Sequence, residues 1–387
     1  MYSKRINNIR VSSIMKYNDI VSQREKKGIH FYKANMGQPN FESHSIMFES
    51  LAKYSKKIND YTSPKGIEKL RENYALYVKA KIKKDVYSAD NIIITQGASD
   101  GIIKILYCIC DEQDEILILE PFFSDYKIYC DILNIKIKSI DYEEENYGKY
   151  ITNKTKAVLF SNPNNPDGRI ISKKQITKLI RIANENDIFI ISDEVYGEIL
   201  YTNKYNSLLK EEDKHIIIVD SASKKLNACG SRIGFVISNN KELLDKITIL
   251  NDSKISISNI EQYVVNFLLQ KHQEISKSNT KCYKDRMNLI SKLLKNSNID
   301  FNRPMGGITM LLSLPIRDAE KYVEWLASTY ESDGYSLLLT SANDFYTSEH
   351  GKNKIRLSLT INDDDIENMV EILLNSIKEY QEVENND

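Results

Sequence analysis

Lys224 is the residue whose surroundings most directly indicate chemistry. It lies in Ser221-Ala-Ser-Lys224, directly after the apolar run 216–219, which is typical of a buried strand. A lysine leaving such a strand is held against the core, where its charge is costly and its pKa falls. A lysine of low pKa can form a Schiff base with an aldehyde. Ser221, Ser223 and Arg232 lie close by in the sequence and are groups that bind phosphate.

An aldehyde-capturing lysine beside phosphate-binding groups suggests pyridoxal phosphate as the ligand. The adjacent Lys225 competes with Lys224 for the same role. Asp193 and Tyr196 follow another apolar run, 188–191. A carboxylate at a strand end can pair with the protonated ring nitrogen of pyridoxal phosphate, and a nearby tyrosine can hydrogen-bond its phenolic oxygen. The same Asp-Glu pair would also suit a helix cap or a metal ligand.

Three loops could bring backbone groups to the same place. Residues 161–168, Ser-Asn-Pro-Asn-Asn-Pro-Asp-Gly, contain two Asn-Pro dipeptides that force a defined turn. Residues 96–101 turn directly from a strand into a helix, whose free N–H groups can bind an anion. Residues 35–41 are broken by Gly37 and Pro39. Each loop taken alone is equally well explained as a structural turn.

The elements that must position these groups alternate along the chain. Strands are predicted at 91–95, 116–119, 157–160, 188–191, 216–219 and 233–237, with helices between several of them. Short, continuously apolar runs of this kind are typical of strands buried on both faces, so an α/β fold with a mostly parallel sheet is predicted. Ligands of such sheets bind at the carboxyl ends of the strands, where the candidate groups lie.

The remaining pattern predicts further helices at 45–58, 67–78, 100–110, 260–295, 318–330 and 363–380, and strands at 308–314 and 354–360. We expect a large ligand-binding domain over 45–285 and a smaller α+β domain from 1–44 and 286–387. The chain of 387 residues is long enough for both.

Bulk composition excludes several classes of protein. Hydrophobic residues make up 41% and charged residues 28%, and the formal net charge is −1, which gives no case for nucleic acid or an anionic membrane. The sequence has no apolar run near the ~18 residues that span a bilayer and no signal-peptide core at its N-terminus, so a cytoplasmic location is expected. The five cysteines lack the spacing of a disulfide framework or a zinc site, and no metal is expected.

The motifs together resemble the fold-type I pyridoxal-phosphate aminotransferases, the aspartate aminotransferase-like group. Five motifs occur in that family's order and spacing, from Gly37-Gln-Pro-Asn-Phe41 to Arg356. The resemblance implies ping-pong transfer of an amino group between an α-amino acid and a 2-oxo acid through pyridoxamine phosphate, with an aspartate/2-oxoglutarate-like pair as one expectation. It also implies a homodimer.

The resemblance implies roles for individual residues. The spacing to Gly230, Arg232 and Gly234 selects Lys224 over Lys225 as the Schiff-base lysine. Together with Lys224, Asp193 at the ring nitrogen and Tyr196 form the expected catalytic set. The expected cofactor-binding residues are Ala98, Ser99, Ser221, Ser223 and Arg232 at the phosphate, Phe123 stacked on the ring, Asn165 and Tyr196 at the phenolic oxygen, and Tyr61 from the neighbouring subunit. Arg356 would clamp the substrate α-carboxylate, with Asn165 and the Gly37 backbone close by.

Departures from the family pattern concern substrate choice. Ser99 stands where some aspartate-specific relatives carry a lysine for the distal carboxylate, and the region of Ile308 lacks a common aromatic residue. A lyase, decarboxylase or oxidase on the same scaffold is the alternative, because fold does not fix function. A non-catalytic regulator would normally add a basic DNA-binding region, which this sequence lacks. A further alternative is a doubly wound protein that binds another phosphate ligand. Such a protein would not need all five motifs at successive strand ends.

Overall fold

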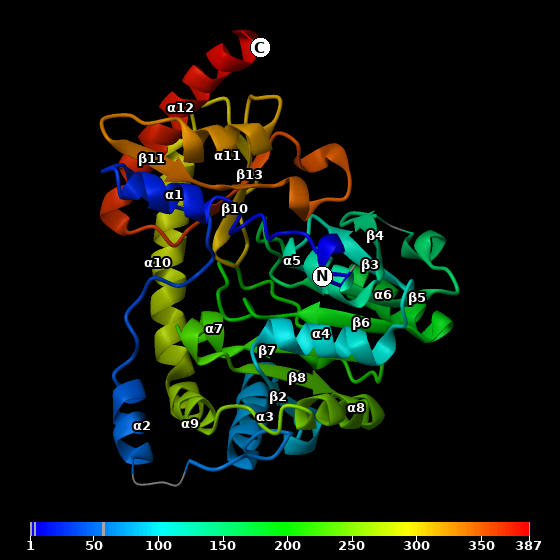
Figure 1. Ribbon diagram of the computed structural model, residues 1–387. Coiled ribbons are helices and arrows are strands. Elements are labelled where there is room, and N and C mark those ends of the chain that lie inside the picture. Colours follow the sequence, from blue (N-terminus) through cyan, green and yellow to red (C-terminus); the bar gives the residue numbers. More distant parts are fainter. Residues whose placement is uncertain (1, 4, 56–58, 145, 387) are drawn as a thin grey trace.

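A seven-stranded sheet forms the centre of the computed structural model, which describes residues 2–3, 5–55, 59–144 and 146–386 (Figure 1). The strand order is β2-β8-β7-β6-β5-β3-β4, and β8 runs in the direction opposite to the other six strands. This confirms the predicted mostly parallel sheet. The strands are β2 (Ile92–Thr95), β3 (Glu115–Glu120), β4 (Lys136–Asp141), β5 (Thr155–Ser161), β6 (Phe189–Asp193), β7 (Ile216–Ser221) and β8 (Gly234–Ser238).

Alternate residues of these strands pack into two hydrophobic clusters, one on each face of the sheet. Ile92, Leu117 and Val158 join α3 (Glu68–Ile82), α6 (Lys173–Asn186) and α9 (Asn259–Leu268) in one cluster. On the other face, the neighbouring Ile93 and Ile116 join α4 (Ala98–Ile109), α5 (Asp125–Leu133) and α8 (Lys241–Asp252). Burial on both faces explains why the strand sequences are continuously apolar.

The edge strand β4 was not predicted. Its residues, Lys-Ile-Lys-Ser-Ile-Asp, alternate in polarity and are mostly half-buried or exposed, because β4 pairs with β3 on one side only. A search for continuously apolar runs does not find such a strand.

The single helix predicted across 260–295 is wrong. The structure has α9, a 3₁₀ turn at Leu269–Lys271 and then α10 (His272–Leu293). The two helices serve different cores: α9 buries Val264 against the sheet, while the far end of α10 buries Met287 in a third cluster. The chain therefore changes direction where the sequence, free of Gly and Pro, gives no stop signal.

The third cluster holds together elements from both ends of the chain. A four-stranded antiparallel sheet has the order β12-β13-β10-β9, and β1 (His30–Lys33) pairs in parallel with β11 (Tyr335–Leu338). The other elements are β9 (Asp300–Phe301), β10 (Thr309–Ser313), β12 (Thr340–Ser341), β13 (Lys354–Ser358), α1 (Asn18–Glu25), α11 (Ala319–Ser328) and α12 (Ile366–Asn386). The strands β1 and β11 are short and were not predicted.

The remaining predicted elements agree with the structure apart from their ends. The helix predicted at 45–58 is observed as α2 (Ile46–Tyr54), and residues 56–58 lie outside the described part of the chain. Among the helices that the structure describes, none is long and apolar enough to span a membrane.

Candidate active site

A cavity of about 450 Å³ lies at the carboxyl ends of the central strands. Side chains from β6 and β7, the starts of α4 and α5, the loop after β1 and the strand β13 meet around it. The sequence-predicted residues that line it are Gly37, Ala98, Ser99, Phe123, Asn165, Asp193, Tyr196, Ser221, Ser223, Lys224, Arg232 and Arg356. The fold therefore brings together residues more than 300 positions apart in the sequence. Among the predicted site residues, only Tyr61 does not line the cavity.

Lys224 reaches the cavity from α7 (Ala222–Lys225), a single turn directly after β7. Ser221 caps this turn, its hydroxyl accepting the Ser223 N–H at 2.9 Å. The Lys224 Nζ donates to the Gly37 carbonyl oxygen at 2.5 Å. Burial lowers the pKa of the Lys224 ammonium, and the nearby Arg356 and Arg232 lower it further. The neutral amine, which is the nucleophilic form, is therefore more accessible than in an exposed lysine.

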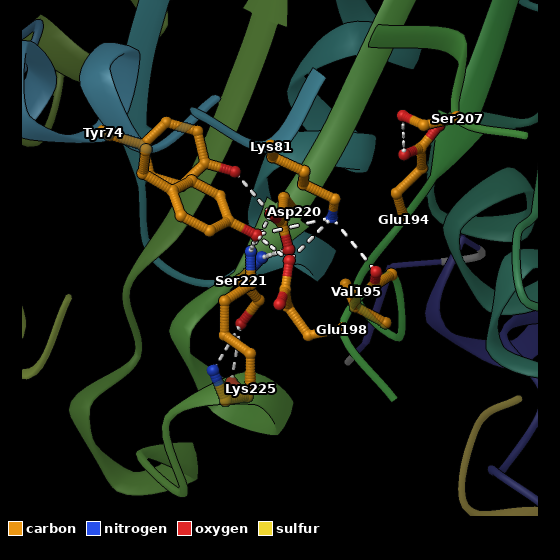
Figure 2. Close-up of polar contacts among 12 residues, drawn as sticks. Tyr74, Lys81, Glu194, Val195, Glu198, Ser207, Asp220, Ser221 and Lys225 are labelled. Atoms are coloured by element: carbon orange, nitrogen blue, oxygen red, sulfur yellow. Dashed lines mark hydrogen bonds and ion pairs between the residues drawn. The ribbon is translucent and has the colours of Figure 1, made fainter. Parts of the chain in front are cut away.

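Lys225 is held away from the cavity. It is buried and forms an ion pair with Asp220, and its Nζ also donates to the Tyr77 hydroxyl at 3.1 Å (Figure 2). Lys225 does not line the cavity, whereas Lys224 does. The geometry therefore agrees with the choice of Lys224 between the two adjacent lysines.

Asp193 ends β6 and places its carboxyl group at the cavity. The Tyr126 hydroxyl donates to Asp193 Oδ2 at 2.8 Å, and the Val195 N–H donates to Oδ1 at 3.3 Å. Burial raises the pKa of Asp193 to about 6 despite these hydrogen bonds. A buried carboxylate of this kind gains from a cationic partner in the cavity, such as a protonated ring nitrogen.

A cup of donor groups lies near the start of α4. Ala98 and Ser99 begin this helix, whose N-terminal N–H groups favour an anion. The hydroxyls of Ser221 and Ser223 are 2.8 Å apart at the end of β7. The Arg232 guanidinium packs so closely on Gly97 that a Cβ there would lie 2.5 Å from Nη2. Backbone amides, hydroxyls and a guanidinium are the groups that hold a phosphate.

Arg356 lies on β13, a strand of the four-stranded sheet, and 1% of its surface is exposed. Its Nη1 is 3.4 Å from Asn165 Oδ1, and its Nη2 donates to the Asn35 carbonyl oxygen. The buried Nε has no hydrogen-bond partner within the described residues. Burial lowers the pKa of Arg356 to about 10. Arg356 lines the cavity, and a guanidinium with an unsatisfied N–H there fits a carboxylate ligand.

Tyr196 and Phe123 complete the walls that the sequence predicted. Burial raises the pKa of the Tyr196 hydroxyl, so this group is a neutral hydrogen-bond donor. A Cβ added to Gly37 would lie 3.6 Å from that hydroxyl oxygen. Phe123 meets Tyr126 edge to face, with ring centroids 5.5 Å apart.

Sequence reasoning missed several residues of the site. The Tyr129 hydroxyl donates to the Ser99 hydroxyl at 2.8 Å, and the Tyr126 hydroxyl donates to Asp193, but the sequence analysis assigned neither tyrosine a role. The missed residues that line the cavity are Ile14, Met36, Gln38, Ile102, Tyr129, Ser161, Val195, Cys229 and Gly230. The position of Tyr126 and Tyr129 shortly after the Phe123 motif was the available signal.

Tyr61 does not line the cavity in the single chain. Its side chain is 77% exposed, on the loop before α3. Its predicted place at the phosphate of a neighbouring subunit therefore stays a prediction.

The donor set fits pyridoxal phosphate. An amine of lowered pKa, a buried carboxyl group and an anion-binding cup face one cavity. The unsatisfied Arg356 Nε supplies a separate point for a substrate carboxylate. These are the groups that such a cofactor and an amino acid require together.

The chain is similar in sequence and in fold to known aminotransferases. The sequence model of the family described as aminotransferase class I and II matches residues 33–373. The chain is 32% identical to the (5-formylfuran-3-yl)methyl phosphate transaminase of Methanocaldococcus jannaschii, over 79% of this chain and 82% of that protein. It is 30% identical to a probable aspartate aminotransferase of the same organism, over 96% of this chain and 99% of the relative. The solved aspartate aminotransferase of Thermus thermophilus with maleate superimposes with a TM-score of 0.89 at 21% identity, covering 97% of this chain and 99% of that one.

Proposed function

Because the chain belongs to the aminotransferase class I and II family and is a transaminase, we propose that it binds pyridoxal phosphate at Lys224. In this proposal it moves an amino group between an α-amino acid and a 2-oxo acid. The observation that carries the proposal is the pairing of Lys224, of lowered pKa, with Asp193, of raised pKa, across one cavity beside a phosphate cup. A carboxyl and an amine whose environments shift them in this way are typical of a catalytic site.

Each group in the site has a defined task. Bound pyridoxal phosphate supplies an electron sink for the bonds of the substrate α-carbon. The groups that would hold its phosphate are Ala98, Ser99, Ser221, Ser223 and Arg232. Asp193 would pair with the ring nitrogen, Phe123 would pack on the ring, and Asn165 and Tyr196 would hydrogen-bond its phenolic oxygen.

Arg356 orients the substrate. Its guanidinium, whose Nε has no partner among the described residues, would bind the α-carboxylate bidentately, with the Asn165 side chain and Gly37 backbone beside it. The Lys224 amine would accept the α-proton and, as an ammonium, return it to the carbon that joins the substrate nitrogen to the cofactor ring. Hydrolysis by a water molecule would then release the 2-oxo acid and leave the amino group on the cofactor.

Loss of burial would weaken this proton transfer. Burial holds the pKa of Lys224 below its ordinary value, so a larger share of the free amine is available as a base than for an exposed lysine. The Gly37 carbonyl, which accepts a hydrogen bond from Nζ, keeps the amine at the cavity wall.

The experiment is an absorbance titration of the holoenzyme with single amino acids, followed by analysis of the cofactor. Aspartate with 2-oxoglutarate is the first pair to test. The relative that this chain matches over 99% of the relative's length is named a probable aspartate aminotransferase. Transamination predicts conversion of the cofactor to pyridoxamine phosphate and appearance of the 2-oxo acid. Release of CO₂ or ammonia without pyridoxamine phosphate would show a lyase, decarboxylase or oxidase instead.

Lys224→Ala is the matched variant. It should lack the visible absorbance of the lysine-bound cofactor, while Lys225→Ala at saturating pyridoxal phosphate should show it, because Lys225 lies outside the cavity. Retention of the absorbance by Lys224→Ala would show that another residue holds the aldehyde.

The proposal includes a homodimer in which Tyr61 of one subunit contacts the phosphate in the other. The support is its exposure: a tyrosine that is 77% exposed on a loop is available to a second copy of the chain.

A further inference from the structure

A buried network of charged and tyrosine side chains lies outside the set of cavity-lining residues and takes no part in the proposed proton transfer (Figure 2). Lys225 and Asp220 form its centre, with side chains 1% and 3% exposed. The Lys225 Nζ also donates to Tyr77, and the Tyr74 hydroxyl donates to the Asp220 carboxylate. Tyr74 and Tyr77 both lie on α3, far from this ion pair in the sequence.

The ion pair brackets the segment that carries the reactive lysine. Asp220 precedes Ser221 and Lys225 follows Lys224, so the pair joins the end of β7 to the last residue of the single turn α7. Asp220 Oδ1 also accepts the Ser221 N–H at 2.6 Å. One carboxylate thus holds the backbone of a phosphate-cup residue and the side chain next to Lys224.

A second arm of the network reaches the loop after Asp193. The Tyr77 hydroxyl donates to Glu198 at 2.5 Å, and the Lys81 Nζ pairs with Glu198 at 3.0 Å and donates to the Gly197 carbonyl at 3.1 Å. Although burial opposes ionisation, Lys81 and Lys225 lower the pKa of Glu198 to about 2. The loop that carries Tyr196 is therefore held to the same helix, α3, as the turn of Lys224.

Stability alone does not account for this arrangement. Burying two charges costs several kcal/mol each, and replacing a buried ion pair with apolar residues of similar volume is often neutral or stabilising. Apolar side chains would not reproduce the fixed relative position of the two charged groups, because a hydrogen-bonded ion pair is stable in only a few orientations.

We propose that the Lys225–Asp220 pair is a positioning clamp for residues 221–224, which holds Lys225 out of the cavity and fixes Lys224 and the two serine hydroxyls for the cofactor. The inference rests on the proposed function, since it concerns how this turn is presented to pyridoxal phosphate. Lys225 and Asp220 act through Lys224 and Ser221 and are positioning residues.

The test compares Lys225→Met with the double variant Lys225→Met/Asp220→Leu. The single variant leaves a carboxylate buried without its ammonium and should lower the melting temperature. The double variant removes both charges and should regain most of that loss. Leu373→Ala is the control, because it destabilises a fully buried position of α12 in the third cluster, away from the cavity.

Three readouts separate positioning from stability: melting temperature, the dissociation constant of pyridoxal phosphate from equilibrium dialysis, and kcat against KM. Both clamp variants should bind pyridoxal phosphate about tenfold or more weakly, the factor that loss of one charge-assisted hydrogen bond carries. Their kcat should fall more than their KM changes, because a misplaced amine slows the chemical step. Leu373→Ala should retain wild-type cofactor affinity at its lowered melting temperature.

Recovery of cofactor affinity by the double variant together with its melting temperature would overturn the proposal. So would an equal loss of affinity in Leu373→Ala. If Lys225→Met does not fold, Tyr77→Phe decides, since it keeps the ring and deletes one hydroxyl: weaker cofactor binding supports the clamp, and unchanged binding overturns it. A wild-type protein that binds pyridoxal phosphate without transferring an amino group would refute the proposed function, while the dissociation constants would still test the clamp.

Discussion

The choice between Lys224 and Lys225 shows what single residues reveal before a structure is known. Adjacent lysines have the same chemistry, and the residues alone left the choice open. The choice depends on the contacts of Lys225 with Asp220 and with Tyr77 of α3, two residues that are distant from each other in the sequence. Residue types at strand ends, by contrast, carry enough information to predict Asp193 and Arg232 at the cavity.

Arg356→Met tests the carboxylate site. Loss of the buried guanidinium should raise KM for the amino acid by about 100-fold, since a charge-assisted bidentate contact is lost, and should leave the affinity for pyridoxal phosphate unchanged. Steady-state kinetics and cofactor dialysis give the two values. Arg286→Met is the matched control, because Arg286 is 6% exposed and pairs with Asp363 outside the cavity; an equal rise in KM there would contradict the assignment.

Asp193→Asn tests the buried carboxyl group through stability. The pKa of Asp193 is raised from 3.8 to about 6 in the folded, cofactor-free protein, so the folded state binds this proton more tightly than the unfolded state. The resulting stability is fully present below about pH 4 and is lost as the pH rises through 6, on the order of 3 kcal/mol. Asparagine does not titrate, so the variant should melt higher than the cofactor-free wild type at pH 8 and equally at pH 4.

Added pyridoxal phosphate should reverse that order at pH 8. A cationic ring nitrogen stabilises the Asp193 carboxylate but gains little from an amide. Thermal melts with and without cofactor measure this, and a variant stabilised by cofactor as much as the wild type would contradict the pairing.

At the scale of the elements, continuous apolar runs predicted six strands of the central sheet, because strands buried on both faces have that composition. The same criterion missed β4, an edge strand, and the short pair β1 and β11. The break between α9 and α10 was also missed, since it reflects which core each helix joins.

The junction between β2 and α4 gives a prediction at this scale. Gly97 caps α4 with φ of 86°, and a Cβ there would lie 2.5 Å from Arg232 Nη2. Gly97→Ala should therefore displace the Arg232 guanidinium and weaken pyridoxal phosphate binding about tenfold or more.

Gly28→Ala is the control for backbone strain in that experiment. Gly28 has φ of 97° but nothing within 4 Å of an added Cβ, so alanine there should cost only about 1 kcal/mol of stability. Equal cofactor affinity in the two glycine variants, measured by dialysis, would show that the contact with Arg232 is unimportant.

For the whole molecule, the sequence predicted the α/β class and one site at the strand ends, because both follow from the order of apolar runs and polar loops. The division into 45–285 and 1–44 with 286–387 stays a prediction. So does the homodimer, because an interface depends on surfaces that a sequence pattern does not encode.

The shared site gives a complementation test. Tyr61→Ala and Lys224→Ala should each reduce activity, Lys224→Ala completely. In mixed dimers, one of the two sites would combine Lys224 and Tyr61 from different chains and be intact. Co-expression should therefore restore part of the activity, and purified mixed dimers should have about half the wild-type activity. No recovery in dimers that contain both chains would show that Tyr61 acts within its own chain.

The order of the site along the chain also sets the order in which it becomes available during translation. All residues of the phosphate cup and Lys224 have been synthesised once β8 has been made. Arg356 lies much later in the chain, on β13 of the four-stranded sheet. At about 5–20 residues per second, roughly ten seconds of synthesis separate the two. A nascent chain would thus present its cofactor-binding groups to the ribosome's surroundings before it holds the arginine that selects amino acids.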